Sequence, residues 1–208
     1  MLDLDETLVH FKDSRYLTDD QKLKVRPGVA QFLEQLDPYY KFVVFTAAQK
    51  MYADFVINKI DPNGVYIKER FYRDHCRLIG KHQAKDLNLV LAQQNNQTSG
   101  SLHSDQEMKS TAAPSTDPRD RQPNPAASSV MDLNKVIIID NLSESFQLQP
   151  LNGIKIRDWF GTDLKDRHLL DLIAPLQAIA EKQVHDVRLE LSKFRKSQLT
   201  QTRNSPLS

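Results

Sequence analysis

The sequence predicts an α/β fold in which a central, mostly parallel sheet is flanked by helices. Short apolar runs alternate with segments whose apolar residues recur at helical spacing, which is the pattern of such a fold. Two of the runs, residues 41–46 and 135–141, are rich in β-branched or aromatic residues, as buried parallel strands are. Both end in polar residues, and ligands of α/β sheets bind at the carboxyl ends of the strands.

Composition is that of an ordinary intracellular domain. The 208 residues are enough for one domain with a full hydrophobic core. With 28 basic and 27 acidic residues the net charge is +1, which does not indicate direct nucleic-acid binding. The single cysteine, Cys76, excludes an internal disulfide framework. No apolar run approaches membrane-spanning length and no signal-peptide pattern is present, so we expect a soluble monomer without a membrane segment.

The first eight residues hold the earliest chemical signal. Asp3 and Asp5 are two residues apart between leucines, and Thr7 follows. On an extended strand they project from the same side, where two like charges need a cation or a proton. The pair suits a Mg²⁺ site with a carboxylate nucleophile, although an acidic turn after a short strand would also fit this stretch alone. Almost nothing precedes Asp3, so we expect either that the chain is a fragment or that this strand is cut short.

The elements expected in the first half follow in order. A polar connection over 12–24 leads to a helix that begins near Pro27 and has an apolar face. The buried strand 41–46 ends in Thr46, and the next helix is stopped by the turn sequence at 61–64. A short strand is expected at 65–67. The basic stretch 70–87 has the composition of a solvated face.

The second half contains a long polar insertion. Residues 93–131 are rich in Gln, Asn, Ser, Thr and Pro and have no aromatic residue, so we expect a disordered surface segment. Order resumes with the strand 135–141. A short strand at 153–156, a helix with apolar positions from 169 to 179 that contains Pro175, and a last helix over 186–196 complete the list. Residues 1–92 and 132–196 therefore form one predicted domain, and 197–208 a flexible tail.

Three predicted strands end in chemically active residues. These ends carry Asp3 and Asp5, Thr46, and the pair Asp140 and Asn141, and all would meet at one sheet edge. Lys85 lies in the chain between the last two. Together they supply a nucleophile, a second carboxylate, a hydroxyl, a cation and further oxygen ligands. Phosphoryl transfer requires such a set.

The motifs resemble those of the haloacid dehalogenase superfamily, and specifically its FCP/SCP-type phosphatases with an FCP homology domain. The resemblance covers nearly the whole chain except the insertion and the tail, and its details are most similar to the C-terminal-domain small phosphatase-like subgroup. It rests on Leu2-Asp3-Leu4-Asp5-Glu6-Thr7-Leu8-Val9-His10, Arg26-Pro27, Phe45-Thr46-Ala47, Tyr52-Ala53-Asp54, Tyr72-Arg73-Asp74-His75-Cys76, Lys85-Asp86-Leu87, Ile138-Ile139-Asp140-Asn141, Asn152-Gly153-Ile154 and Asp158-Trp159-Phe160. It implies a Rossmann-like fold without a large cap domain.

The resemblance also implies residue roles. Asp3 would attack phosphorus and become a phospho-aspartate, while Asp5 would protonate the leaving oxygen and then activate the hydrolytic water. Mg²⁺ would be held by the Asp3 carboxylate, the Asp5 carbonyl and Asn141, with Asp140 close to the ion. The residues expected to bind the substrate phosphate are Thr46, Lys85 and Arg73.

We interpret the chain as a Mg²⁺-dependent serine/threonine protein phosphatase, because an open site favours a phosphate presented on a protein. The RNA polymerase II tail is one candidate substrate, although residues 11–25 are short for the pocket-forming hairpin of the small phosphatases. Nuclear action is implied by the resemblance, with the cytoplasm as the other compartment. Two alternatives stay open. One is a catalytically silent binding module, as in mitochondrial import translocases of this fold, and the other is a small-molecule phosphatase.

Overall fold

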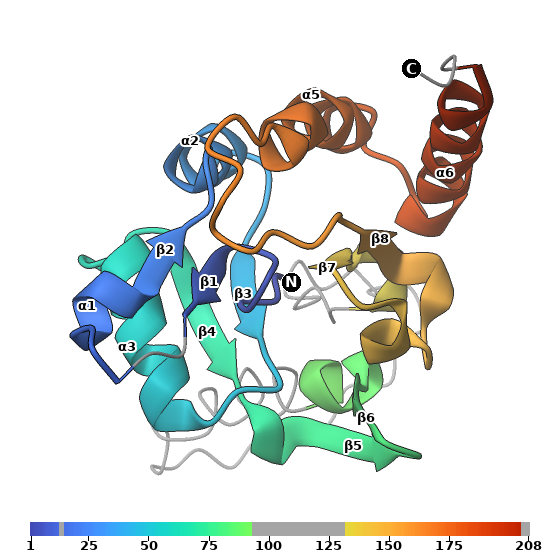
Figure 1. The fold of residues 1–208 in the computed structure, drawn as a ribbon. Coiled ribbons are helices and arrows are strands. Elements are labelled where there is room, and N and C mark those ends of the chain that lie inside the picture. The colour runs from blue at the N-terminus through green and yellow to red at the C-terminus, as the bar shows by residue number, and fades with distance from the viewer. Residues whose placement is uncertain (13–14, 93–131, 205–208) are drawn as a thin grey trace, which may run out of the picture.

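The structure is a computed structural model that describes residues 1–12, 15–92 and 132–204 (Figure 1). Its strands are β1 (Val9–Phe11), β2 (Leu23–Val25), β3 (Phe42–Phe45), β4 (Ile67–Phe71), β5 (Cys76–Ile79), β6 (His82–Lys85), β7 (Ile138–Asp140) and β8 (Gly153–Lys155). Its helices are α1 (Asp19–Lys22), α2 (Val29–Leu36), α3 (Lys50–Ile60), α5 (His168–Glu181) and α6 (Val187–Asn204), and residues 87–92 are also helical. Short 3-10 turns occupy Arg73–His75, Leu133–Lys135, Ser143–Phe146 and Pro150–Asn152.

A parallel sheet forms the centre of the domain. β3 pairs with β4 and β7 pairs with β8, both in parallel. Leu2 joins these two halves through parallel bridges to Val44 of β3 and Ile139 of β7. The residues before Asp3 thus lie in the middle of the sheet, and their pairing is confined to bridges at Leu2.

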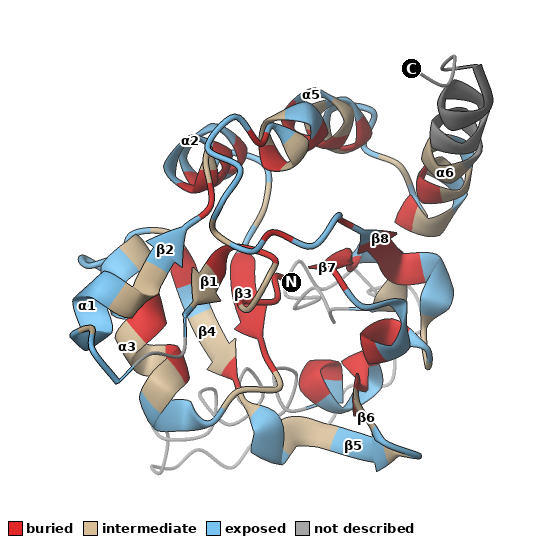
Figure 2. Cartoon of the chain, in the orientation of Figure 1, coloured by how far each residue is buried: buried red, intermediate tan, exposed pale blue. Residues whose placement is uncertain are grey.

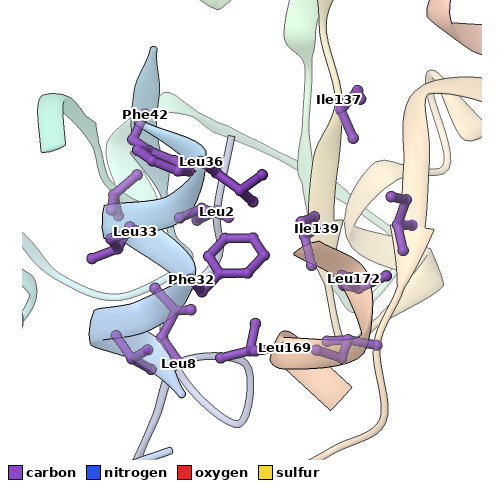
Figure 3. Close-up of a cluster of buried hydrophobic side chains, with 14 of the residues drawn as sticks. Leu2, Leu8, Phe32, Leu33, Leu36, Phe42, Ile137, Ile139, Leu169 and Leu172 are labelled. Atoms are coloured by element: carbon purple, nitrogen blue, oxygen red, sulfur yellow. The ribbon is translucent and has the colours of Figure 1, made fainter. Parts of the chain in front are cut away.

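Alternation along the strands divides the core into two layers. Phe42, Val44 and Ile139 contribute to the larger cluster with α2, α3 and α5. Val43, Phe45 and Ile138 point to the opposite cluster, which includes residues of the 87–92 helix. Figure 3 shows side chains of α2 and α5 meeting over the first face, and Figure 2 shows the burial of the central strands. The sheet is therefore covered by helices on both faces.

The contact between α2 and α5 depends on a glycine. Gly28, immediately before α2, has a φ of 85°, and a Cβ at this position would lie 2.7 Å from Cγ of Leu170 on α5. Only a glycine permits both this left-handed backbone and this approach. The Arg26-Pro27-Gly28 sequence thus sets where α2 begins and how closely α5 covers it.

Two antiparallel hairpins lie beside the parallel sheet. β1 pairs with β2, and β5 pairs with β6. The described residues contain no larger domain inserted over the strand ends, so the described part of the chain has no large cap. Among the described helices, none combines the length and the apolar character that a membrane span needs.

Several predicted boundaries are wrong. The strand expected at 65–67 begins only at Ile67 and runs to Phe71, because the Asp61 carboxylate accepts the backbone N–H groups of residues 65, 66 and 67 and holds them in a turn. The stretch 70–87 contains the β5–β6 hairpin, on which Arg77 is exposed, as expected of a solvated face, while Lys85 is buried. The last helix does not end at Lys196 but continues to Asn204, within the predicted tail. The predicted insertion 93–131 lies outside the described residues.

Candidate active site

A cleft of about 420 Å³ opens at the carboxyl ends of the central strands. All seven predicted site residues line it: Asp3, Asp5, Thr46, Arg73, Lys85, Asp140 and Asn141. They come from the first residues of the chain, the ends of β3, β6 and β7, and the 3-10 turn after β4. The structure therefore brings together every side chain that the sequence assigned to the site.

The turn after Asp3 is built by the sequence that follows it. The carbonyl of Leu4 accepts the N–H groups of Thr7, Leu8 and Val9, and the Leu4 and Leu8 side chains are fully buried. Glu6 adopts a φ of 57°, which is rare for a residue with a side chain. Buried leucines on either side thus anchor a tight, strained turn that directs its polar residues toward the cleft.

Asp3, Lys85 and Asp140 form the buried centre of the site. The Lys85 Nζ donates to Asp3 Oδ1 at 2.6 Å and to Asp140 Oδ2 at 2.5 Å. Burial raises the pKa of Asp3 to about 7, against the opposing effect of Lys85. Burial alone would lower the pKa of Lys85, but the two carboxylates raise it above its ordinary value. One cation therefore holds two carboxylates in a buried cluster.

Asp5 lies on the more open side of the cleft. Its Oδ1 accepts a hydrogen bond from the hydroxyl of Tyr52 on α3 at 2.5 Å. Burial raises the pKa of Asp5, while the Tyr52 bond and the charge of Lys85 act in the opposite direction. Burial and the neighbouring carboxylates, with Asp5 first among them, raise the pKa of Tyr52. The phenol is therefore a proton donor to Asp5 throughout the physiological range.

A second set of oxygens lies beside Asp3. The Thr7 hydroxyl is 3.2 Å from both Asp3 Oδ2 and Asn141 Oδ1. A hydroxyl has one proton, so it satisfies only one of these two acceptors at a time. The Asn141 Nδ2 donates to Asp158 Oδ1 at 2.7 Å, which orients the amide with its oxygen toward Asp3.

These oxygens fit a hard divalent cation. The Asp5 carbonyl accepts no hydrogen bond from the described residues, and it joins Asp3 Oδ2 and Asn141 Oδ1 as an available acceptor. No group of three or more His, Cys, Asp or Glu side chains suited to a metal occurs among the described residues. The proposed Mg²⁺ ligands would not form such a group. Only Asp3 and Asp140 would contribute carboxylates, and the other ligands would be the Asp5 carbonyl and the Asn141 amide oxygen.

Thr46 and Arg73 occupy the far wall of the cleft. The buried Thr46 Oγ1 accepts the N–H of Ala48 at 3.0 Å, so its own proton is free to point elsewhere. The Arg73 Nε donates to the Ala47 carbonyl at 2.6 Å, and its two Nη groups have no hydrogen-bond partner among the described residues. The guanidinium is thus anchored at one nitrogen and presents the others to an anion.

A buried ion pair supports the turn from behind. Arg26 binds Asp166 through two hydrogen bonds, from Nε at 2.7 Å and from Nη2 at 3.0 Å. Its Nη1 donates to the carbonyls of Thr7, at 3.0 Å, and Glu6, at 3.5 Å. Both charged side chains are almost completely buried. The pair therefore connects the segment before α5 to the turn that carries Asp5.

Sequence reasoning missed three contributors to this site. From the sequence, Tyr52, Asp158 and Arg26 are identified only as parts of motifs and have no assigned role, and the Arg26–Asp166 pair is not predicted. The two partners of that pair are 140 residues apart. For Tyr52 the available signal was its position, since it lies in the first turns of the helix that follows the strand end at Thr46.

Comparison with known proteins gives one family. The sequence matches the family described as NLI interacting factor-like phosphatase over residues 1–111 and 126–188. It is 31% identical to the mitochondrial import inner membrane translocase subunit TIM50 of Mus musculus, over 93% of this chain and 43% of the relative. It is 32% identical to CTD small phosphatase-like protein 2 of Dictyostelium discoideum, over 96% of this chain and 30% of the relative.

Two further matches extend this list. The CTD nuclear envelope phosphatase 1B of Danio rerio is 31% identical over 93% of this chain and 70% of its own length. The solved structure of Fcp1, described as an essential RNA polymerase II CTD phosphatase, has a TM-score of 0.49 and 18% identity over 100% of this chain and 54% of its own. The chain thus spans less than half the length of the TIM50 and Dictyostelium relatives.

Proposed function

The chain belongs to the family of NLI interacting factor-like phosphatases, of the FCP/SCP type in the haloacid dehalogenase superfamily, and we propose that it is a Mg²⁺-dependent serine/threonine protein phosphatase. The observation that carries the proposal is the arrangement of the two aspartates. Asp3 is buried and held by Lys85, whereas Asp5 is less buried and, among the described side chains, accepts a hydrogen bond from Tyr52. Two carboxylates in such different environments suit different roles, a nucleophile and an acid–base group.

In the first half of the reaction, a carboxylate oxygen of Asp3 attacks phosphorus. The bond between phosphorus and the seryl or threonyl oxygen breaks, and Asp5 gives its proton to that oxygen. Lys85 favours the ionised, nucleophilic form of Asp3 and balances the charge of Asp140. Thr46 would offer its hydroxyl proton to the phosphoryl oxygens, and Arg73 would offer the Nη groups that have no hydrogen-bond partner among the described residues.

In the second half, water attacks the phosphorus of the phospho-aspartate. Asp5, now a carboxylate, takes the proton of that water, and the bond to the Asp3 oxygen breaks to restore the free enzyme. A Mg²⁺ ion held by Asp3, the Asp5 carbonyl and Asn141, near Asp140, would neutralise charge that accumulates on the phosphoryl oxygens. The side chains that would hold it lie together, since Asp3 and Asn141 share one hydroxyl partner.

The openness of the site favours a phosphorylated protein as substrate. The described residues place no cap domain over the cleft, and its walls are the ends of the strands and short turns. A small metabolite in this cleft would remain in contact with water, whereas a protein segment itself covers the site. The substrate class is a phosphoserine or phosphothreonine in an accessible protein segment, with the RNA polymerase II tail as one candidate. For the compartment we propose the nucleus, on the strength of the nuclear envelope phosphatase among the relatives.

A catalytically silent binding module is the second candidate function. It is favoured by the 31% identity to a mitochondrial translocase subunit over nearly the whole chain. The two functions differ in what Asp3 is needed for. A binding module requires its fold but no nucleophile. A phosphatase becomes inactive when one carboxylate oxygen of Asp3 is replaced.

The test is Mg²⁺-dependent phosphate release from a phosphoserine peptide by wild type and by Asp3→Asn. Asp37→Asn, at the exposed end of α2, is the matched control for an exchange of carboxylate for amide. Circular dichroism and thermal unfolding accompany each measurement. Release that requires Mg²⁺, persists in Asp37→Asn and disappears in Asp3→Asn supports the phosphatase. No release by folded wild type, from either the peptide or an aryl phosphate, overturns it and leaves the binding module.

A further inference from the structure

Asp5 has one side-chain partner among the described residues, the hydroxyl of Tyr52. The bond is short, 2.5 Å, and it engages Oδ1. No hydrogen bond from a described side chain engages the other carboxyl oxygen, Oδ2. A carboxyl group with one oxygen fixed in this way can rotate little, so the position of its second oxygen is fixed as well.

Tyr52 is itself held from two sides. It belongs to α3, which begins at Lys50 directly after the turn that carries Thr46 and Ala47. Its ring contacts the ring of Phe11 edge to face, with centroids 5.4 Å apart and planes at 86°. Phe11 lies on β1, paired with Leu23 of β2. A helix and a hairpin thus place the Tyr52 hydroxyl, and the hydroxyl places Asp5.

We propose that Tyr52 is the positioning residue of the general acid, holding Asp5 Oδ1 so that Oδ2 carries the proton to the leaving oxygen. This inference rests on the proposed phosphatase function. In the acid step the bond between phosphorus and the seryl oxygen breaks, and the proton of Asp5 Oδ2 passes to that oxygen. Tyr52 keeps its own proton throughout, and its hydrogen bond to Oδ1 stabilises the carboxylate that results.

The contribution of Tyr52 to the rate depends on whether the leaving group must be protonated. A seryl oxygen is a poor leaving group and must be protonated as it departs, so its release needs a well-placed acid. The 4-nitrophenolate ion is stable without a proton, and its release from 4-nitrophenyl phosphate does not need one. A residue that acts by positioning the acid therefore affects the first substrate far more than the second.

The experiment compares kcat/KM of wild type and Tyr52→Phe on a phosphoserine peptide and on 4-nitrophenyl phosphate. The variant keeps the ring and its contact with Phe11 and removes only the hydroxyl. Since general acid catalysis contributes about 10²- to 10⁴-fold, we expect a loss of about 10-fold or more on the peptide. On the aryl phosphate we expect a change below about 3-fold, because kcat/KM includes only the steps through phospho-aspartate formation.

Tyr40→Phe is the matched control. It also removes one phenolic hydrogen bond, in this case to the carbonyl of Leu176, and Tyr40 does not line the active-site cleft. A double-mutant cycle with Asp5→Asn tests whether Tyr52 acts through Asp5. In the Asp5→Asn background we expect Tyr52→Phe to have little further effect on the peptide.

Three results would overturn the positioning role while leaving the phosphatase in place. The first is an equal loss of kcat/KM on both substrates, and the second is no loss on the peptide. The third is a loss in the Asp5→Asn background as large as in wild type, which would show that Tyr52 contacts the peptide directly. A folded wild type without activity on either substrate refutes the proposed function instead. The two failures are therefore distinguishable.

Discussion

The buried pair of Arg26 and Asp166 provides the sharpest prediction of stability. Asp166→Ala removes the carboxylate and leaves the guanidinium of Arg26 without its partner in the interior. Breaking a buried ion pair in this way costs about 3–5 kcal/mol. We expect the lower end, about 3 kcal/mol, because Nη1 of Arg26 keeps its bonds to backbone carbonyls. For a domain of this size that is a decrease in Tm of roughly 6–12 °C.

Urea denaturation followed by circular dichroism gives the free energy of unfolding for wild type and variant. The matched control is Asp171→Ala, which breaks the exposed pair with Arg167. Exposed pairs contribute about 0–1 kcal/mol, so the control should remain close to wild type. If Asp166→Ala and Asp171→Ala are destabilised equally, the buried pair does not support the fold as the structure indicates.

The pH dependence of the same measurement tests the cause. Burial alone would raise the pKa of Asp166, but the hydrogen bonds from Arg26 and His168 lower it below its ordinary value. A carboxylate with a lowered pKa in the folded state adds stability above its unfolded pKa of about 4 and loses it as the pH falls further. The difference in stability between wild type and Asp166→Ala should therefore shrink below about pH 4.

Three further predictions concern other sites. Asp158→Ala frees the amide of Asn141 to rotate, and calorimetric titration should show Mg²⁺ affinity reduced by about 10-fold or more; an unchanged affinity would remove Asp158 from the site. Asp61→Ala leaves three backbone N–H groups without their acceptor and should lower the free energy of unfolding by about 2 kcal/mol, as measured by denaturant titration. Asp37→Ala is the near-neutral control. Burial raises the pKa of the Cys76 thiol to about 11. Its alkylation by iodoacetamide at pH 8 should therefore be at least about 10-fold slower in the folded protein than in urea. Equal rates, measured by mass spectrometry, would contradict the burial of Cys76.

The sequence was informative where chemistry and hydrophobic pattern coincide. Thr46 and the pair Asp140 and Asn141 end apolar runs that are typical of buried strands, so their position at the sheet edge could be predicted from the topology. The predicted α/β class is confirmed by the parallel pairing of β3 with β4 and of β7 with β8. The roles assigned to the seven residues stay predictions.

Elements held together by long-range contacts were not predictable in the same way. The basic residues between 70 and 87 recur at spacings of four, which imitates a solvated helix face, yet Lys85 is buried and ends a hairpin strand. Its burial depends on Asp3 and Asp140, which are 82 and 55 residues away. Tyr52 fits the apolar pattern of its helix, and only the folded structure shows that its hydroxyl reaches Asp5.

The central position of Leu2 has a consequence for biosynthesis. The segment around it is synthesised before the rest of the described domain, but it finds its place between β3 and β7 only when the chain near Asn141 has been made. Thr7 and Asn141 are 134 residues apart, an interval that takes on the order of ten seconds to translate. During that time Leu2 lacks β7, one of its two neighbouring strands. We therefore expect nascent chains to need chaperone protection until β7 emerges, and expression at lower temperature to raise the soluble yield.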